Sequence, residues 1–399
     1  KKYFDYLNKE IPKRPMIQWS KARIGDLLYC IHWYCEQTGE TQGELVAELR
    51  KQALDWNGVF KEFPFTRPSE YYYNWKSLLE HYQKPFVDDI MKYHTNHIVN
   101  LTMGFKYPAM LSYFFDDMDF EKITEMGLRS AHRYHGVVSG VVNGDEHLAG
   151  NNPSRGSELC SVVEYMFSLQ TMAEAFGTGR YTDQIEKLAY NALPATITED
   201  FMAHQYLQQA NQVLVSKAKR DWFNTNDESN LFGLEPNFGC CTANMHQGWP
   251  KLLKSMWLKE DENTLISMVH GPSSIVTELA GNRVSISEET EYPFKNRICY
   301  RVTEGNAPSA VFRIWIPEWC KDFRVCIDGA WKNRERTEDY LTVHGLHAGS
   351  EMTVEFSMDI RKSFWYKDSM AIERGPLVFA LDMNCLLYTS PSPRDLSTS

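Results

Sequence analysis

The sequence lacks the features that would place it in several broad classes of protein. It contains no run of about 18 apolar residues, so we predict no membrane-spanning helix. It has no cluster of lysine and arginine residues interleaved with aromatic residues, and its formal net charge of −10 argues against nucleic acid as a partner. Its nine cysteines in 399 residues are too few for a disulfide scaffold.

The two ends of the sequence also lack native features. The chain starts at Lys1, without a methionine and without a visible signal peptide, so we expect the native N-terminus to be missing. Localisation therefore stays unassigned, because a cytoplasmic and an exported protein are both compatible with this start. At the other end, residues 385–399 resemble the translation of a transposon adapter used in sequencing-library preparation. We expect them to be a non-native tail and the chain to be a fragment cut at both ends.

Aromatic residues, in contrast, are abundant and make up 13% of the chain. Such residues suit a sugar-binding cleft, but they fill hydrophobic cores equally well. The length of 399 residues is typical of two domains with a large core.

Residues 1–258 are predicted to form a helical domain. The predicted helices cover residues 22–37, 43–56, 98–115, 120–135 and 181–195, with further helices before His97, from Ser157 and after Cys241. Thr-Gly pairs at 38–39 and 178–179 separate successive helices and hint at repeated helical hairpins. Such hairpins can close into an (α/α) toroid, although a simple helical bundle fits the pattern as well.

Residues 259–384 are predicted to form an incomplete antiparallel β-sandwich, which makes the fold α+β and multidomain. The predicted strands cover residues 265–269, 275–279, 284–287, 298–302, 311–316, 323–327, 340–343 and 352–356. Several of them alternate apolar and polar residues, as a half-buried strand does.

Three cysteines lie where helices are expected to begin. Cys240 and Cys241 are adjacent and precede an amphipathic helix, and Cys160 follows Glu158 at the start of another. A helix N-terminus favours a thiolate over a thiol. Three thiolates and one carboxylate make a four-ligand zinc set. The alternative is a group of buried, inert thiols beside a glutamate that only complements the helix dipole.

Other polar motifs could contribute to a site. Glu146 lies in a glycine-flanked acidic loop at residues 143–150, which could present a carboxylate into a cleft or form a solvated turn. Residues 203–212, which include Tyr206, are dense in amide and hydroxyl groups that suit sugar hydroxyls, but a surface loop or strand fits nearly as well. His94 and His97 precede an apolar helix and could equally be core histidines.

Together these motifs resemble the β-L-arabinofuranosidase family, glycoside hydrolase family 127. The resemblance rests on Gly144-Asp145-Glu146-His147-Leu148, Glu158-Leu159-Cys160 and Cys240-Cys241-x-x-Asn244, and it extends from about residue 97 to residue 377. It implies an (α/α)6 barrel that holds a zinc ion, followed by β-sandwich modules. It also implies a set of site residues: zinc ligands Glu158, Cys160, Cys240 and Cys241, nucleophile Cys240, acid/base Glu146, and substrate contacts His97 and Tyr206.

The activity implied by the resemblance is retaining hydrolysis of an L-arabinofuranoside or a related sugar in a plant-type glycan, with a zinc-bound thiolate as nucleophile. Two stretches depart from the family pattern and leave the sugar open. Residues 18–21 read Gln-Trp-Ser-Lys where relatives can carry a substrate histidine, and the loop at 151–155 differs in length and composition. The alternatives are a polysaccharide lyase on a similar toroid and a non-catalytic carbohydrate-binding protein braced by zinc.

Overall fold

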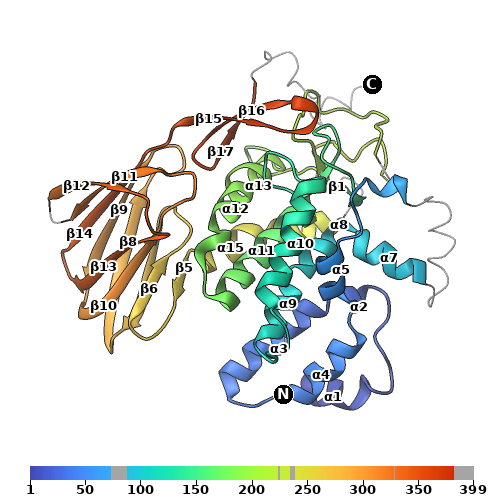
Figure 1. Cartoon of the computed structure of the whole chain (residues 1–399), viewed down its shortest axis with the longest axis horizontal. Helices are drawn as coiled ribbons and strands as arrows, with labels where there is room; N and C mark the ends of the chain where they lie inside the picture. Colours follow the sequence, from blue (N-terminus) through green and yellow to red (C-terminus); the bar gives the residue numbers. More distant parts are fainter. Residues whose placement is uncertain (73–87, 223–224, 234–238, 328, 382–399) are drawn as a thin grey trace. The chain divides into compact units, whose positions relative to one another are not determined.

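Figure 1 shows the computed structural model of the chain, which describes residues 1–72, 88–222, 225–233, 239–327 and 329–381. The chain forms two compact units. The first contains Lys1–Phe176 and Ala192–His246, and the second contains Gly177–Asn191 and Gln247–Leu381. The predicted tail at 385–399 lies outside the described residues. Within the described part of the chain, no helix combines the length and the apolar character needed to cross a membrane.

Helices dominate the first unit. They are α1 (Lys2–Glu10), α2 (Trp19–Ala22), α3 (Ile24–Thr38), α4 (Gly43–Gln52), α5 (Trp56–Glu62), η1 (Ser69–Tyr71), α7 (Asp88–Asn96), α8 (Ile98–Gly104), α9 (Lys106–Ser112), α10 (Phe120–His135), α11 (Leu159–Phe176), α13 (Leu193–Ala195) and α14 (Gly239–Met245). Four short strands accompany them: β1 (Gly144–Asp145), β2 (His147–Leu148), β3 (Ser157–Glu158) and β4 (Leu207–Gln208).

Helix α10 has the bounds that the sequence predicts, residues 120–135. The Asp119 side chain caps it by accepting a hydrogen bond of 3.0 Å from the Lys122 N–H. Its buried residues include Phe120 and Ile123, three positions apart, as an amphipathic helix requires. A strong cap and a clear apolar period therefore define this helix locally.

The helix predicted over 98–115 is two helices, α8 and α9, separated at Phe105. Pro108 lies in the first turn of α9, where its missing N–H is tolerated. In one continuous helix that N–H would have to bond to the carbonyl of Gly104, so the proline favours a break. The helix predicted over 181–195 is likewise divided, into α12, η3 and α13.

The helix predicted after Cys241 is also interrupted. Helix α14 ends at Met245, and the next helix, α15 (Gly248–Lys254), carries Pro250 in its first turn. A continuous helix would leave the carbonyl of His246 without the N–H of residue 250, which proline lacks. After α15, Trp257 begins strand β5.

A four-stranded sheet of two-residue strands, in the order β2-β1-β3-β4, joins distant loops of the first unit. Asp145 pairs with His147, and Glu158 pairs with Leu207. Glu158 therefore belongs to a strand. The sequence pattern had placed it in the first turn of the following helix. This sheet brings the loop of Glu146 beside the start of α11.

Lys106 is a fully buried lysine that joins three helices of the first unit. Its Nζ lies 2.7 Å from Asp26 Oδ1 and 3.4 Å from Glu164 Oε2. Replacing Lys106 by methionine should lower the free energy of unfolding by about 2 to 3 kcal/mol, because it leaves Glu164 buried without a counter-charge. Urea unfolding measures this change. The exposed ion pair of Lys51 with Glu48 offers the matched variant Lys51→Met, whose effect should stay within about 0.5 kcal/mol.

Strands dominate the second unit. They are β5 (Trp257–Lys259), β6 (Thr264–Ser267), β7 (Ser273–Leu279), β8 (Asn282–Thr290), β9 (Arg297–Glu304), β10 (Asn306–Trp315), β11 (Asp322–Ile327), β12 (Ala330–Glu335), β13 (Tyr340–His347), β14 (Glu351–Phe356), β15 (Ile360–Phe364), β16 (Met370–Arg374) and β17 (Leu377–Phe379). The unit also contains η2 (Gly179–Tyr181), α12 (Thr182–Lys187), most of η3 (Leu188–Ala192), α15 and η4 (Tyr366–Asp368).

The strands form sheets in the orders β13-β10-β6-β5, β12-β11-β14-β9-β8-β7 and β15-β16-β17. All eight predicted strands are present. Strand β12 was not predicted, because every residue in it is exposed and it shows no alternation. The expectation of purely antiparallel pairing is wrong for one pair, since β6 and β10 run parallel. Side chains of the two larger sheets meet at Tyr300 and Phe312, whose ring centroids are 5.3 Å apart.

Candidate active site and metal centre

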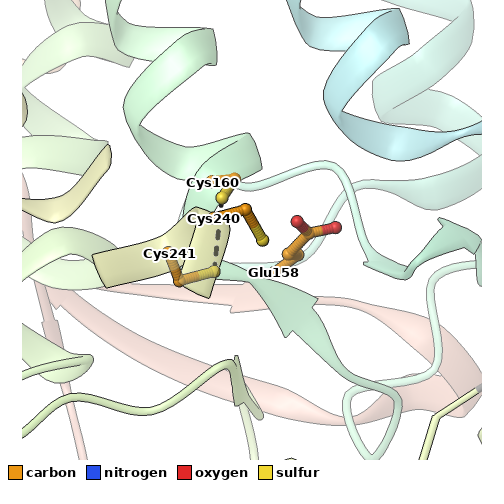
Figure 2. Close-up of side chains that lie close together, drawn as sticks. All are labelled: Glu158, Cys160, Cys240 and Cys241. Atoms are coloured by element: carbon orange, nitrogen blue, oxygen red, sulfur yellow. Dashed lines mark hydrogen bonds between the residues drawn. The ribbon is translucent and has the colours of Figure 1, made fainter. Parts of the chain in front are cut away.

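Four side chains that the sequence predicts as metal ligands converge in the first unit (Figure 2). One ligand atom from each of Glu158, Cys160, Cys240 and Cys241 lies within 4.8 Å of the ligand atoms of the other three. The Sγ atoms of Cys160 and Cys241 are 3.3 Å apart. Ligands bound at about 2.0 to 2.3 Å to one metal ion are separated by up to roughly 4.6 Å. The four groups can therefore reach one ion with small movements.

The ligands come from three elements. Glu158 is the last residue of β3, Cys160 lies in the first turn of α11, and Cys240 and Cys241 lie in the first turn of α14. The N–H of Leu159 donates to the carbonyl of Tyr206 at 3.0 Å, which ties the β3–α11 junction to the neighbouring chain. The backbone therefore fixes the spacing between Glu158 and Cys160 before any metal binds.

Exposure to solvent separates one ligand from the others. Glu158 is 2% exposed, Cys160 2% and Cys241 0%, whereas Cys240 is exposed. Three groups therefore have the burial expected of permanent metal ligands. Cys240 is the member of the cluster that is exposed to solvent.

The four groups share negative charge unevenly. Hydrogen bonds from Cys160 and Cys241 lower the pKa of Cys240 to about 3. The hydrogen bond with Cys240 raises the pKa of Cys160, and burial raises that of Cys241. Burial, followed by the charges of Glu146 and Cys240, raises the pKa of Glu158. Burial and hydrogen bonding thus raise the pKa of three of the four groups, and a bound cation would favour their charged forms.

Glu146 occupies the sharp turn between β1 and β2, with φ of 80°. This left-handed conformation is costly for a residue with a side chain and marks functional turns in many proteins. The Glu146 carbonyl accepts a hydrogen bond of 3.1 Å from the N–H of Ile98. Behind the turn, Asp145 is buried and binds Arg155 Nε at 2.8 Å. The turn is therefore fixed from both sides.

The Glu146 carboxylate is held by two donors. Oε1 lies 3.2 Å from His97 Nε2, and Oε2 accepts a hydrogen bond from the Tyr206 hydroxyl. Burial opposes ionisation of Glu146, but the hydrogen bond and charge of His97, with the Tyr206 hydroxyl, hold its pKa below the ordinary value. The two predicted substrate contacts thus touch the predicted acid/base directly.

The tautomer of His97 follows from its position at the start of α8. Its Nδ1 accepts a hydrogen bond of 3.3 Å from the N–H of Asn100. A ring nitrogen that accepts carries no proton, so in the neutral ring the proton is on Nε2, facing Glu146. His97, Glu146 and Glu158 also form a second group of potential ligand atoms within 4.8 Å of one another. All seven predicted site residues therefore lie together.

The polar stretch at 203–212 is more buried than the sequence suggested. Gln205 and Gln208 are buried and donate hydrogen bonds to the carbonyls of Asn230 and Ala192, at 2.6 and 2.7 Å. These amides therefore support the backbone and are not available to sugar hydroxyls. Tyr206, between them, is the member of the stretch that contacts Glu146.

A layer behind His97 was not predicted from the sequence. The Trp19 ring lies edge-on to His94 and His97, with centroids 4.8 and 4.9 Å away. The amide of Asn100 lies 3.3 Å from His94 Nδ1 and accepts a hydrogen bond from Arg23. The only sequence signal was the unusual stretch at residues 18–21. Long-range pairs such as Arg23 with Asn100 leave no local pattern.

Comparisons with known proteins agree on one family. The model described as "Beta-L-arabinofuranosidase, GH127 catalytic domain" matches residues 120–254, and "Beta-L-arabinofuranosidase, GH127 middle domain" matches residues 264–360. Together these matches span more than half of the chain. No curated protein is detectably similar in sequence.

Solved structures with the same fold include a GH127 β-L-arabinofuranosidase from Geobacillus stearothermophilus T6, with 17% identity and a TM-score of 0.64, over 93% of this chain and 68% of that one. A glycoside hydrolase shares 15% identity with a TM-score of 0.64, over 94% and 73% of the two chains. A GH127 β-arabinofuranosidase shares 16% identity with a TM-score of 0.57, over 89% and 63%. On the strength of its two domain matches, this chain belongs to the GH127 family of glycoside hydrolases.

Proposed function

We propose that this enzyme is a retaining glycoside hydrolase that releases L-arabinofuranose or a related sugar from plant-type glycans, with Cys240 as nucleophile and Glu146 as acid/base. The observation that carries the proposal is one solvent-exposed cysteine in an otherwise buried cluster of three cysteines and Glu158, beside a hydrogen-bonded carboxylate. His97 and Tyr206 are the proposed substrate contacts.

The metal that best fits these residues is Zn²⁺. Three sulfur donors and one carboxylate are a zinc-type set, whereas Mg²⁺ and Ca²⁺ prefer oxygen ligands. Oε2 of Glu158 is buried and has no hydrogen-bond partner among the described residues, as expected of an atom that serves a metal. When bound, zinc would keep the sulfur of Cys240 deprotonated and fix its direction.

The proposed first step is attack of the Cys240 sulfur on the anomeric carbon. A carbon–sulfur bond forms, the glycosidic carbon–oxygen bond breaks, and a proton passes through Glu146 to the leaving oxygen. Glu146 enters this step protonated, gives that proton to the leaving oxygen, and becomes the carboxylate to which His97 and Tyr206 hydrogen-bond. In the second step, Glu146 takes a proton from water, whose oxygen replaces sulfur at the anomeric carbon with net retention.

We further propose that the helices of residues 1–258 form part of an (α/α)6 toroid and that residues 259–384 form a β-sandwich. Helix α9 packs against α3, α10 and α11, which suits successive antiparallel pairs. The facing side chains of Tyr300 and Phe312 suit two stacked sheets.

A screen of the purified chain tests the function. Aryl α- and β-L-arabinofuranosides, other furanosides and pyranosides are compared, and NMR identifies the anomer released first. We expect hydrolysis of a furanoside with retention. Release of an unsaturated product that absorbs in the ultraviolet would show a lyase, and inactivity of the zinc-loaded protein on every substrate would contradict the proposal.

The metal proposal predicts a defined effect of Cys241→Ser. Loss of one buried sulfur ligand should lower zinc affinity at least about tenfold, and should lower the melting temperature because metal binding stabilises the folded site. Metal analysis by mass spectrometry and chelator competition measure the affinity. Cys320→Ser is the matched control, since Cys320 is equally buried but lies outside the cluster. Equal zinc content in both variants would exclude Cys241 as a ligand.

A further inference from the structure

Arg23 is an exposed arginine at the junction of α2 and α3. It is the residue that precedes the 15-residue helix α3. A cation at a helix N-terminus faces the positive end of the helix dipole, which is unfavourable by a few tenths of a kcal/mol or more. Helix stability therefore does not account for an arginine here.

The guanidinium of Arg23 is nevertheless held in a fixed orientation. Its Nε donates a hydrogen bond of 2.9 Å to Oδ1 of Asn100, which is fully buried. Its Cζ lies 4.8 Å from the centroid of the Trp19 ring. Nη1 and Nη2 bond to no residue that the structure describes. The fork of the guanidinium is thus pre-organised and open to a ligand.

This fork lies beside the catalytic residues. Trp19, under the guanidinium, is 4.9 Å from the ring of His97, which in turn bonds Glu146. Asn100 connects Arg23 to His94 by a second contact of 3.3 Å. The pKa of His94 is lowered to about 4, first by burial and then by the charges of His97 and Arg23. The side chains of Trp19 and His97 thus connect the fork to Glu146.

The charge around the site decides which ligand the fork suits. The acidic side chains Glu146 and Glu158 lie together here, with ligand atoms within 4.8 Å of each other, and the chain as a whole carries −10. A neutral sugar needs no cation here, whereas an anionic sugar would be repelled without one. Arginine binds a carboxylate with two parallel hydrogen bonds from its Nη and Nε groups or from both Nη atoms, and only the second mode is open here.

We propose that Arg23 recognises the carboxylate of a uronic acid in a subsite beside the catalytic residues. The substrate would then be a glycan in which the released sugar neighbours a uronic acid. This inference rests on the proposed glycosidase function for its substrate, but the binding of the carboxylate can be measured without hydrolysis.

Calorimetric measurement of the binding of two disaccharides, digalacturonate and galactobiose, tests the proposal. Digalacturonate carries carboxylates where galactobiose carries hydroxymethyl groups. We expect the zinc-loaded protein to bind digalacturonate at least about tenfold more tightly. Arg23→Gln should remove this preference. Arg23→Lys should lose most of it, since an ammonium keeps the charge but not the fork. Arg14→Gln is the matched control, because Arg14 is exposed in the same unit and, among the described residues, forms an ion pair with Glu10 alone.

Two outcomes would overturn the inference: equal binding of both disaccharides by the wild-type protein, or an unchanged preference in Arg23→Gln. If Arg23→Gln and Arg23→Lys lose zinc but keep the preference for digalacturonate, Arg23 instead serves as a counter-charge for the metal site. Hydrolysis of a neutral aryl arabinofuranoside reports separately on the proposed function. Hydrolysis of this neutral substrate, without a preference for digalacturonate, refutes only the role of Arg23. A preference for digalacturonate, without hydrolysis of any furanoside, refutes only the glycosidase function.

Discussion

Replacing Cys240 by serine is expected to lower kcat/KM on an activated aryl arabinofuranoside by about 10⁴-fold or more, the scale seen when a nucleophile is removed. The hydroxyl of serine has a far higher pKa than a thiol and is a weaker nucleophile toward carbon. In the structure the hydrogen bonds of Cys160 and Cys241 lower the pKa of Cys240 and favour its thiolate. The same hydrogen bonds would leave a serine hydroxyl protonated. Initial rates with zinc-loaded protein measure the loss.

The interpretation of Cys240→Ser depends on two further measurements. Zinc content must be determined, because Cys240 is also a predicted ligand, and a metal-free variant would lose activity for a second reason. Cys30→Ser is the matched control, since Cys30 is exposed and outside the cluster. Near wild-type turnover by zinc-loaded Cys240→Ser would eliminate Cys240 as the nucleophile. Inactivity of Cys30→Ser would show that the assay reports general damage.

The parts of the fold that the sequence predicts are those with local causes. Helix α10 has a cap at Asp119 and a clear apolar period, and its bounds match the prediction. Strand β14 (Glu351–Phe356) alternates apolar and polar residues and begins one residue before the predicted strand, 352–356. In both cases neighbouring residues alone determine the backbone.

The parts that were missed depend on distant contacts. The strands β1 to β4 are two residues long, which is too short for any periodic signal, yet they bring Glu146 beside Glu158. The parallel pairing of β6 with β10 joins segments some 50 residues apart, and no local pattern specifies its direction. Arg23 and Asn100 are separated by 77 positions. The four metal-ligand candidates were recognised from their residue types at two expected helix starts, and the resemblance to a known family supported their grouping into one site.

Replacing Glu146 by glutamine should have an effect that depends on the leaving group. An amide cannot transfer a proton, so substrates with poor leaving groups should lose about 10² to 10⁴-fold in kcat/KM. An activated aryl furanoside needs little protonation and should still react with Cys240. Because the second step then lacks its base, the thioglycosyl enzyme should accumulate. A burst of the released phenol should therefore precede slow turnover.

Azide sharpens this experiment, since it attacks the thioglycosyl enzyme without needing a base. With Glu146→Gln and an activated substrate, azide should restore turnover and yield a glycosyl azide of retained configuration. Glu44→Gln is the matched control, because Glu44 is an exposed carboxylate on α4 of the same unit. Equal losses with good and poor leaving groups, without a burst, would argue against Glu146 as the acid. In that case its hydrogen bonds to His97 and Tyr206 would serve only to orient the substrate contacts.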